Sequence, residues 1–328
     1  MKFKDIQLKG KNKDFIEIIK YAVKAPSGHN TQPWLFKIKE GKIEIHPDFT
    51  KSLSVVDPDN RELFVSLGAA TENLSIAATN KGYEVSVSIS EDGIISVELV
   101  KKGTETSTLF PQIFVRQTNR SAYNSSIITE DKINLLKTVD FEPCIRTYFF
   151  KNGTSEFTSI SDLIYEGNSR QMRDSNFKRE LHQWMRYNKK DQDTTRDGLS
   201  YSVFGAPNLP YFIAKWIVSR VVNEKSQNRS DRKKISSSSH FILFTTQNNT
   251  IEEWINLGRT MERTLLKITE MGISHAYMNQ PNEIFELSQK MAEIVGIKNE
   301  YPTILIRVGY GKKMPYSLRK KVEDFLIE

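Results

Sequence analysis

The chain has 328 residues, of which 38% are hydrophobic and 27% charged, and its formal net charge at pH 7 is +7. This is ordinary composition for a soluble globular protein of one large domain or two smaller ones. The basic balance permits an anionic partner, such as a phosphate-bearing cofactor, a nucleic acid or a membrane surface, but does not choose among them.

The single cysteine, Cys144, excludes an intrachain disulfide and fits a reducing compartment. The first residues contain no apolar segment of the kind found in secretory signals. No apolar run approaches the ~18 residues that indicate a membrane span. We therefore expect a cytoplasmic protein with no membrane partner.

The first third of the chain predicts helices and strands in alternation. Residues 13–24 place apolar side chains on one helical face. A second helix is expected from the DPDNRELF stretch to about Lys81, with Gly82 as a left-handed cap. Strands are expected in the segments LFKIKE, KIEIHP, YEVSVSI and IISVELV.

The rest of the chain is richer in helix. Thr129 is a candidate N-cap for the helix EDKINLLKTV, residues 156–187 predict an interrupted helix and residues 251–271 a strong one. Residues 188–239 are polar with Gly and Pro, which predicts a mobile insertion or a lid. The remaining predicted elements are the strands IRTYFF, HFILFTT and YPTILIRVGYG and a terminal helix, SLRKKVEDFL.

Two of the predicted helices share a pattern. Without a gap, LGAATENLSIAATNKG (67–82) and LGRTMERTLLKITEMG (257–272) have Leu, Gly, Glu, Thr and Gly at the same positions. A glycine inside a helix costs about 1 kcal/mol relative to alanine. Its presence at one register in both helices, as Gly68 and Gly258, suggests close packing at a two-fold-related core. The alternative is two amphipathic helices that agree by chance.

The loop KAPSGHNTQPW, residues 24–34, concentrates hydrogen-bonding groups. Ser27 offers a hydroxyl, and the amides of Asn30 and Gln32 can donate and accept. Gly28 permits close approach of the backbone to a planar ligand, and Pro26 stiffens the entry. These groups suit the edge of a heterocycle, although a capping turn between a helix and a strand would also explain them.

Two basic clusters could bind a phosphate. In FVRQTNRSAY, Arg116 and Arg120 flank Thr118, so that two guanidinium groups lie around a hydroxyl. In YSLRKK, Arg319 stands beside two lysines, Lys320 and Lys321. The alternatives are a solvated basic turn for the first cluster and an ordinary surface helix for the second.

Together, these segments resemble the nitroreductase family of flavoproteins. The family loop P-S-[SG]-x-N-x-Q-P-[WF] matches Pro26 to Trp34, and its R-x-[ST]-x-[RK] signature matches Arg116, Thr118 and Arg120. The family also has a basic pair just after a buried strand, and Arg319 with its lysine neighbours matches that pair. The signature follows the loop instead of preceding it, and no second loop appears. This order resembles the subgroup in which two nitroreductase-like halves are fused in one chain, as in Acg-like proteins.

The resemblance implies an α+β fold with two pseudo-symmetric halves, residues 1–110 and 111–328, forming an internal dimer-like unit. It implies one FMN per chain: the first half would bring Pro26, Ser27, Gly28, Asn30 and Gln32 to the flavin ring. The second half would hold the phosphate with Arg116, Thr118 and Arg319. Arg120 would serve the phosphate or the N1–O2 edge, and Asn279, in HAYMNQP, would lie near N5.

The implied activity is transfer of hydride from NAD(P)H, meaning either NADH or NADPH, through flavin N5 to a nitro, quinone or similar small acceptor. No catalytic side chain and no metal is required, and the five histidines show no metal-ligand spacing. His29 is expected to face solvent or to stack. The alternative function is a flavin-sequestering protein in which residues 188–239 form a lid over the flavin. A nucleic-acid-binding module is disfavoured because the basic residues are spread among acidic ones. Whether the chain is a monomer or a homodimer stays open.

Overall fold

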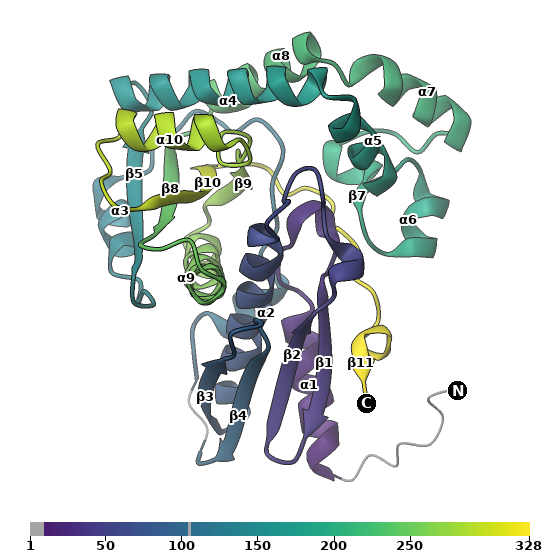
Figure 1. Ribbon diagram of the computed structural model, residues 1–328, viewed down its shortest axis with the longest axis vertical. Coiled ribbons are helices and arrows are strands. Elements are labelled where there is room, and N and C mark those ends of the chain that lie inside the picture. The colour runs from purple at the N-terminus through teal and green to yellow at the C-terminus, as the bar shows by residue number, and fades with distance from the viewer. Residues whose placement is uncertain (1–9, 104–105) are drawn as a thin grey trace.

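The computed structural model describes residues 10–103 and 106–328. It combines helices with two main sheets in an α+β arrangement, as predicted (Figure 1). The first sheet has the strand order β11-β1-β2-β4-β3, and the second, entirely antiparallel, has the order β5-β8-β10-β9. The strand bounds are β1 Trp34–Lys39, β2 Lys42–Pro47, β3 Tyr83–Ile89, β4 Ile95–Lys101, β5 Ile145–Lys151, β8 His240–Thr246, β9 Ser274–Tyr277, β10 Tyr301–Gly309 and β11 Leu326–Ile327.

Helices lie between the sheets and above the second one. Helices α4, α8 and α10 lie over one side of the second sheet, α5, α6 and α7 lie beside it, and α2 and α9 pack together in the centre (Figure 1). No helix in the described ranges is both long enough and apolar enough for a membrane crossing. The helix bounds are α1 Gly10–Ala22, α2 Arg61–Asn80, α3 Glu130–Lys137, α4 Ser155–Arg173, α5 Ser175–Trp184, α6 Lys189–Thr195, α7 Tyr211–Val221, α8 Glu224–Ser236, α9 Ile251–Glu270 and α10 Phe285–Ile294. A small sheet pairs β6 Met185–Arg186 with β7 Leu199–Ser200.

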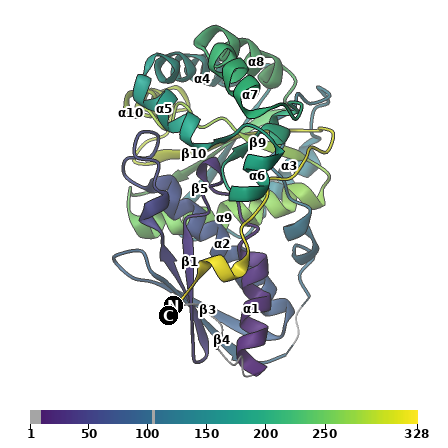
Figure 2. The same cartoon turned by 90° about the vertical axis from the view of Figure 1, so that its right-hand side faces the viewer.

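The prediction of a C-terminal helix is wrong. Residues 310–321 have no regular structure, and after a short 3-10 helix, Val322–Phe325, the chain ends in β11, which pairs in parallel with β1. The Phe325 ring lies 6.3 Å from that of Trp34 and 6.5 Å from that of Phe36. The segment has few apolar residues, and it buries these against β1 instead of forming a free helix. The C-terminal segment (yellow in Figure 2) therefore runs back to the first sheet.

Residues 188–239, predicted as a polar insertion or lid, are mainly helical, forming α6, α7 and α8. The polar character belongs to α8, which packs on α4 through hydrogen bonds: Asn168 Nδ2 donates to Asp231 Oδ2 at 3.0 Å and to Asn228 Oδ1 at 3.0 Å. By contrast, α7 is apolar on most of its surface. The polar composition of the segment as a whole concealed this helix.

The predicted close packing of the two glycine-containing helices is confirmed. A Cβ added to Gly68 of α2 would lie well under 3.0 Å from the carbonyl oxygen of Ile255 on α9. A Cβ added to Gly258 would meet the carbonyl oxygen of Val65 in the same way. Each glycine thus faces the carbonyl three residues before the other glycine. The contact is reciprocal, so the two helices cross at equivalent positions of their shared sequence pattern.

We predict that Gly68→Ala and Gly258→Ala each destabilise the fold by at least the 1–3 kcal/mol typical of overpacking, because the Cβ would meet a backbone oxygen that cannot move alone. Chemical denaturation measures this change. Asn256→Ala, two residues from Gly258 in α9, is the control and should be neutral or slightly stabilising, because alanine favours helix. Equal stability of the glycine variants and the control would contradict the tight crossing.

Candidate functional site

A cavity of about 760 Å³ lies beside the loop at residues 26–30, and most of the predicted site residues line it. Its wall also includes residues 116–120, the segment after β9, the C-terminal segment and helices α5 and α7. Gln32 is the exception among the predicted site residues. The predicted residues on the cavity wall are Pro26, Ser27, Gly28, Asn30, Arg116, Thr118, Arg120, Asn279 and Arg319.

The loop holds an unusual backbone conformation. His29, Asn30 and Gln32 have φ values of +47°, +57° and +57°, in the left-handed region that costs a residue other than glycine roughly 1–2 kcal/mol. The Ser27 hydroxyl accepts a hydrogen bond from the Gln32 backbone N–H at 3.0 Å. Such strain persists only where the surroundings hold it, and it is concentrated at functional sites.

The amides of Asn30 and Gln32 hold this conformation by binding other parts of the protein. Asn30 Nδ2 donates to the carbonyls of Gly198 and Leu318, both at 3.2 Å, and Asn30 Oδ1 accepts from Arg319 at 2.6 Å. Gln32 Nε2 donates to the Arg196 carbonyl at 2.9 Å. Its Oε1 accepts from a backbone N–H of the C-terminal segment at 3.0 Å. Gln32 was predicted to meet the ring, but it does not line the cavity, and its amide links two other segments of the chain.

The two basic clusters come together at this loop. The buried Arg116 places Nε 3.0 Å from Glu262 of α9 and donates to the Lys24 carbonyl at 2.7 Å. Arg319 donates to the Ala25 carbonyl at 2.9 Å. Within the described part of the chain, no group accepts a hydrogen bond from Arg120, whose guanidinium lies 5.5 Å from the Phe204 ring centre. Arg116 is therefore neutralised by a carboxylate, and Arg120 is not.

Charge repulsion and burial act on the same groups. Burial, followed by repulsion from Arg116, lowers the pKa of Arg319 to about 9. Burial also lowers the pKa of Arg120 to about 10, with a smaller contribution from Arg307. The pKa of Lys24 falls through burial and through the nearby Arg319. An anion in the cavity would relieve this repulsion.

His29 lies on the cavity wall, a position that the sequence did not assign to it. Burial and the neighbouring Arg120 lower its pKa to about 4, so its imidazole is neutral at pH 7. The only sequence feature that pointed to a role for His29 in the site was its place at the variable position of the loop motif. The same neutral state holds for His275, whose backbone pairs with Thr118 and whose pKa burial lowers well below 6.5.

Two glutamates that the sequence analysis missed form an acidic end of the cavity. Glu62, in the first turn of α2, accepts a hydrogen bond from Asn279 Nδ2, and Glu283 accepts one from Gln171 Nε2. Burial, then repulsion from Glu283, raises the pKa of Glu62 well above its ordinary value. No motif signals this pair, because residues distant in sequence meet only in the fold.

This acidic end predicts a pH effect on stability. Burial, with a smaller contribution from Asp57 and opposed by Arg61 and Gln171, raises the pKa of Glu283 to about 7. Because the folded state then binds this proton more tightly than the unfolded chain does, its contribution is complete below about pH 4.5 and is lost as pH rises through about 7. Glu283→Gln should therefore raise the thermal midpoint relative to wild type near pH 8 but not near pH 5.

The measurement is the thermal midpoint of the apoprotein at both pH values. Glu91→Gln in the exposed hairpin turn between β3 and β4 is the control, and should change neither midpoint. A Glu283→Gln midpoint that follows wild type across the whole range would show that the carboxyl group does not retain its proton.

Comparison with known proteins finds nitroreductases among the similar chains. No family model matches the chain. Two Mycobacterium tuberculosis proteins, each named "Putative NAD(P)H nitroreductase" (MT3217 and Rv3131), are 24% identical to it over 306 residues, which cover 90% of this chain and 84% of each relative. Solved structures are less similar in sequence. One is the FMN-dependent nitroreductase NfnB from Mycobacterium smegmatis in complex with NADPH, which is 10% identical with a TM-score of 0.40; the match covers 61% of this chain and 86% of that one. A Bacteroides fragilis nitroreductase with bound FMN has 13% identity, a TM-score of 0.40, and coverage of 66% and 96%. The chain is thus similar over nine-tenths of its length to proteins named as nitroreductases.

Proposed function

We propose that the cavity binds one FMN per chain and that the protein is an NAD(P)H-dependent oxidoreductase of a nitro, quinone or similar small acceptor. The observation that carries this proposal is the convergence of the loop and both basic clusters on one cavity with excess positive charge. The named relatives supply the chemistry that such a cavity would serve.

The basic end fits a phosphate group. Arg120 has no acceptor among the described residues, and the buried Arg319 Nε also has none. Thr118 adds a hydroxyl on the same wall. A phosphate offers acceptors to all three and opposes the repulsion that lowers the arginine pKa values. These residues would therefore hold the FMN phosphate, while residues 26–30 would border the ring.

The other residues of the chain would organise the site. Glu262 holds Arg116 at 3.0 Å, and Arg116 in turn holds the Lys24 carbonyl at the start of the loop. Arg120 would place a positive charge near the phosphate or the N1–O2 edge of the ring. The neutral His29 would add no further charge. When bound, FMN supplies the hydride-accepting chemistry.

The two halves would divide this work, with residues 1–110 bringing the loop and residues 111–328 the phosphate arginines. The reciprocal contact of Gly68 and Gly258 supports a two-fold relation between α2 and α9, as two fused nitroreductase-like halves require. The equivalent glutamates on these helices have different partners: Glu262 meets Arg116, whereas Glu72 binds Arg263 at 2.8 Å. This asymmetry supports a single site per chain.

A flavin-sequestering role is the second candidate, because α7 and the residues before it form one wall of the cavity. Leu209, Ala214 and Val218 contribute apolar surface there, and Ala214 is buried. A covered flavin would be protected from nicotinamide donors. The two candidates therefore differ in whether a bound flavin can be reduced from solution.

Anaerobic reduction separates the candidates. We predict that protein loaded with FMN and desalted keeps its flavin absorbance, and that NADPH or NADH then bleaches it within seconds to minutes. Dithionite, which does not require a nicotinamide site, is the control. Bleaching by dithionite alone would favour sequestration, and a chain that retains no flavin would contradict the proposed function.

Arg120→Ala tests the basic end. Loss of a charge-assisted hydrogen bond worth about 1.5–3 kcal/mol should weaken FMN binding roughly 10- to 150-fold. Riboflavin, which lacks the phosphate, shows which part of FMN the arginine contacts. Loss for FMN alone would assign Arg120 to the phosphate, and equal loss for both ligands would assign it to the ring.

Arg179→Ala, an exposed arginine on α5, is the control and should change neither affinity. Unchanged affinity for both ligands in Arg120→Ala would show that the basic end is not the binding site. Arg116→Ala is a poorer test, because it would also leave the buried Glu262 without its cation.

A further inference from the structure

Helix α7 presents the largest cluster of exposed apolar side chains in the described structure. Phe212 is 71% exposed and Trp216 60%, and neither lines the cavity. A helix that only covered the cavity would turn such residues inward. Exposed patches of this kind mark interaction sites.

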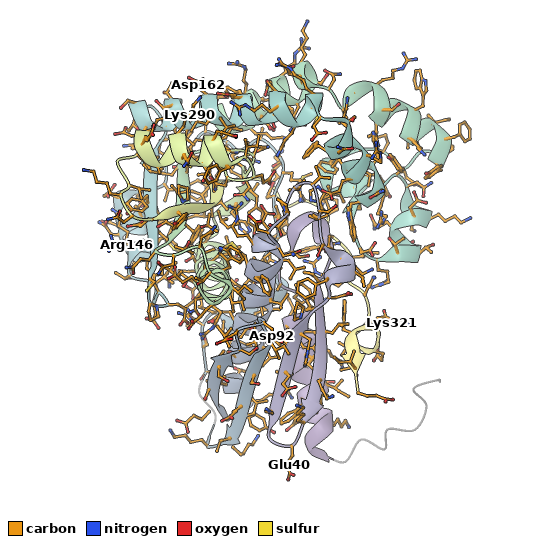
Figure 3. All side chains as sticks on the ribbon, in the orientation of Figure 1. Glu40, Asp92, Arg146, Asp162, Lys290 and Lys321 are labelled. Carbon is orange, nitrogen blue, oxygen red and sulfur yellow. The ribbon has the colours of Figure 1, made fainter. Side chains whose placement is uncertain are left out.

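The two faces of α7 have different surroundings. Phe212, Trp216 and Arg220 are spaced four residues apart and so share the outer face. Ala214 is buried, and Val218 lines the cavity on the opposite face. Helix α7 lies at the right-hand edge of the molecule in Figure 1, the side that faces the viewer in Figure 2, and it is away from the first sheet in both views. Side chains project outward from this end of the molecule in Figure 3.

The charged residues within this helix are all basic. No acidic residue occurs between Asp197 and Glu224. Within α7, Lys215 Nζ lies 5.6 Å from the Tyr211 ring centre, and the Arg220 guanidinium lies 5.2 Å from that of Trp216. Further cations follow on α8, and the whole chain carries +7. The basic residues of α8 are Lys225, Arg229, Arg232, Lys233 and Lys234.

Against the expectation from the sequence that the protein has no membrane partner, we propose that α7 docks the protein on an anionic lipid surface. Aromatic and aliphatic side chains interleaved with Lys and Arg are the composition of helices that lie in the membrane interface, where anionic headgroups attract the cations. A two-fold contact with a second copy would instead bring Lys215 and Arg220 against like charges. The 11 residues of α7 are too few to cross a bilayer, so the helix lies on the surface.

Docking also has a structural consequence for the cavity. Because Val218 lines the cavity from the inner face of α7, the lipid boundary and the cavity would be separated by this one helix. The proposal stands without the proposed function, since it concerns the outer face of the protein alone.

Vesicle co-sedimentation of the full chain tests the proposal. We expect binding to vesicles of phosphatidylcholine mixed with phosphatidylglycerol, little binding to phosphatidylcholine alone, and loss of binding at high salt. Phe212→Ser combined with Trp216→Ser should weaken binding at least tenfold, and Lys215→Gln combined with Arg220→Gln should weaken it severalfold. Phe285→Ser is the control, because Phe285 is 70% exposed on α10, outside this patch.

Thermal midpoints and circular dichroism of the variants show that the fold is intact, and light scattering measures association. Absence of binding to the anionic vesicles would overturn the proposal. So would equal binding to neutral vesicles, because the basic residues would then have no role. A dimer that the Phe212 and Trp216 substitutions dissociate, without vesicle binding, would assign the face to a second copy instead.

Discussion

The reciprocal contact between Gly68 and Gly258 is the constraint on which the rest of this structure depends. With no side chain at either crossing point, α2 and α9 bring backbone against backbone. The crossing sets where the ends and faces of both helices lie. The first turn of α2 carries Glu62 to one end of the cavity, and α9 places Glu262 under Arg116 at the other. Any side chain at the crossing would separate the helices and move both ends of the site.

The cavity is electrostatically divided. At the basic end, one arginine is neutralised by a buried carboxylate, while Arg120 and Arg319 repel their neighbours. At the other end, Glu62 and Glu283 resist ionisation because burial and their proximity disfavour two negative charges. Charged residues elsewhere, such as Arg146, Asp162 and Lys290, lie on the outside (Figure 3). The cations of the cavity are thus set apart by their burial, which strengthens their attraction for an anion.

The strained loop joins segments that are distant in the sequence. Asn30 and Gln32 bind the segments at residues 196–198 and 318–320, so these two segments and the left-handed backbone of the loop hold one another in place. This explains why amides that could read a heterocycle are occupied by the protein itself. It also explains the role of the C-terminal segment, which ends as a strand on the first sheet after passing the loop.

The sequence by itself determined most of the elements and the composition of the site. Periodicity and turn residues located the strands and the main helices, because these signals are local. The loop, the two basic clusters and the HAYMNQP segment together named nine residues that do line one cavity. Tertiary structure alone decided the rest. Leu326 and Ile327 became a strand because the edge of β1 and the aromatic rings of Trp34 and Phe36 were there to receive the C-terminal end. Glu62 and Glu283 form a pair that retains a proton, and Gln32 lies off the cavity wall. Both outcomes depend on burial and hydrogen-bond partners supplied by residues 100 or more positions away, which no local sequence pattern contains.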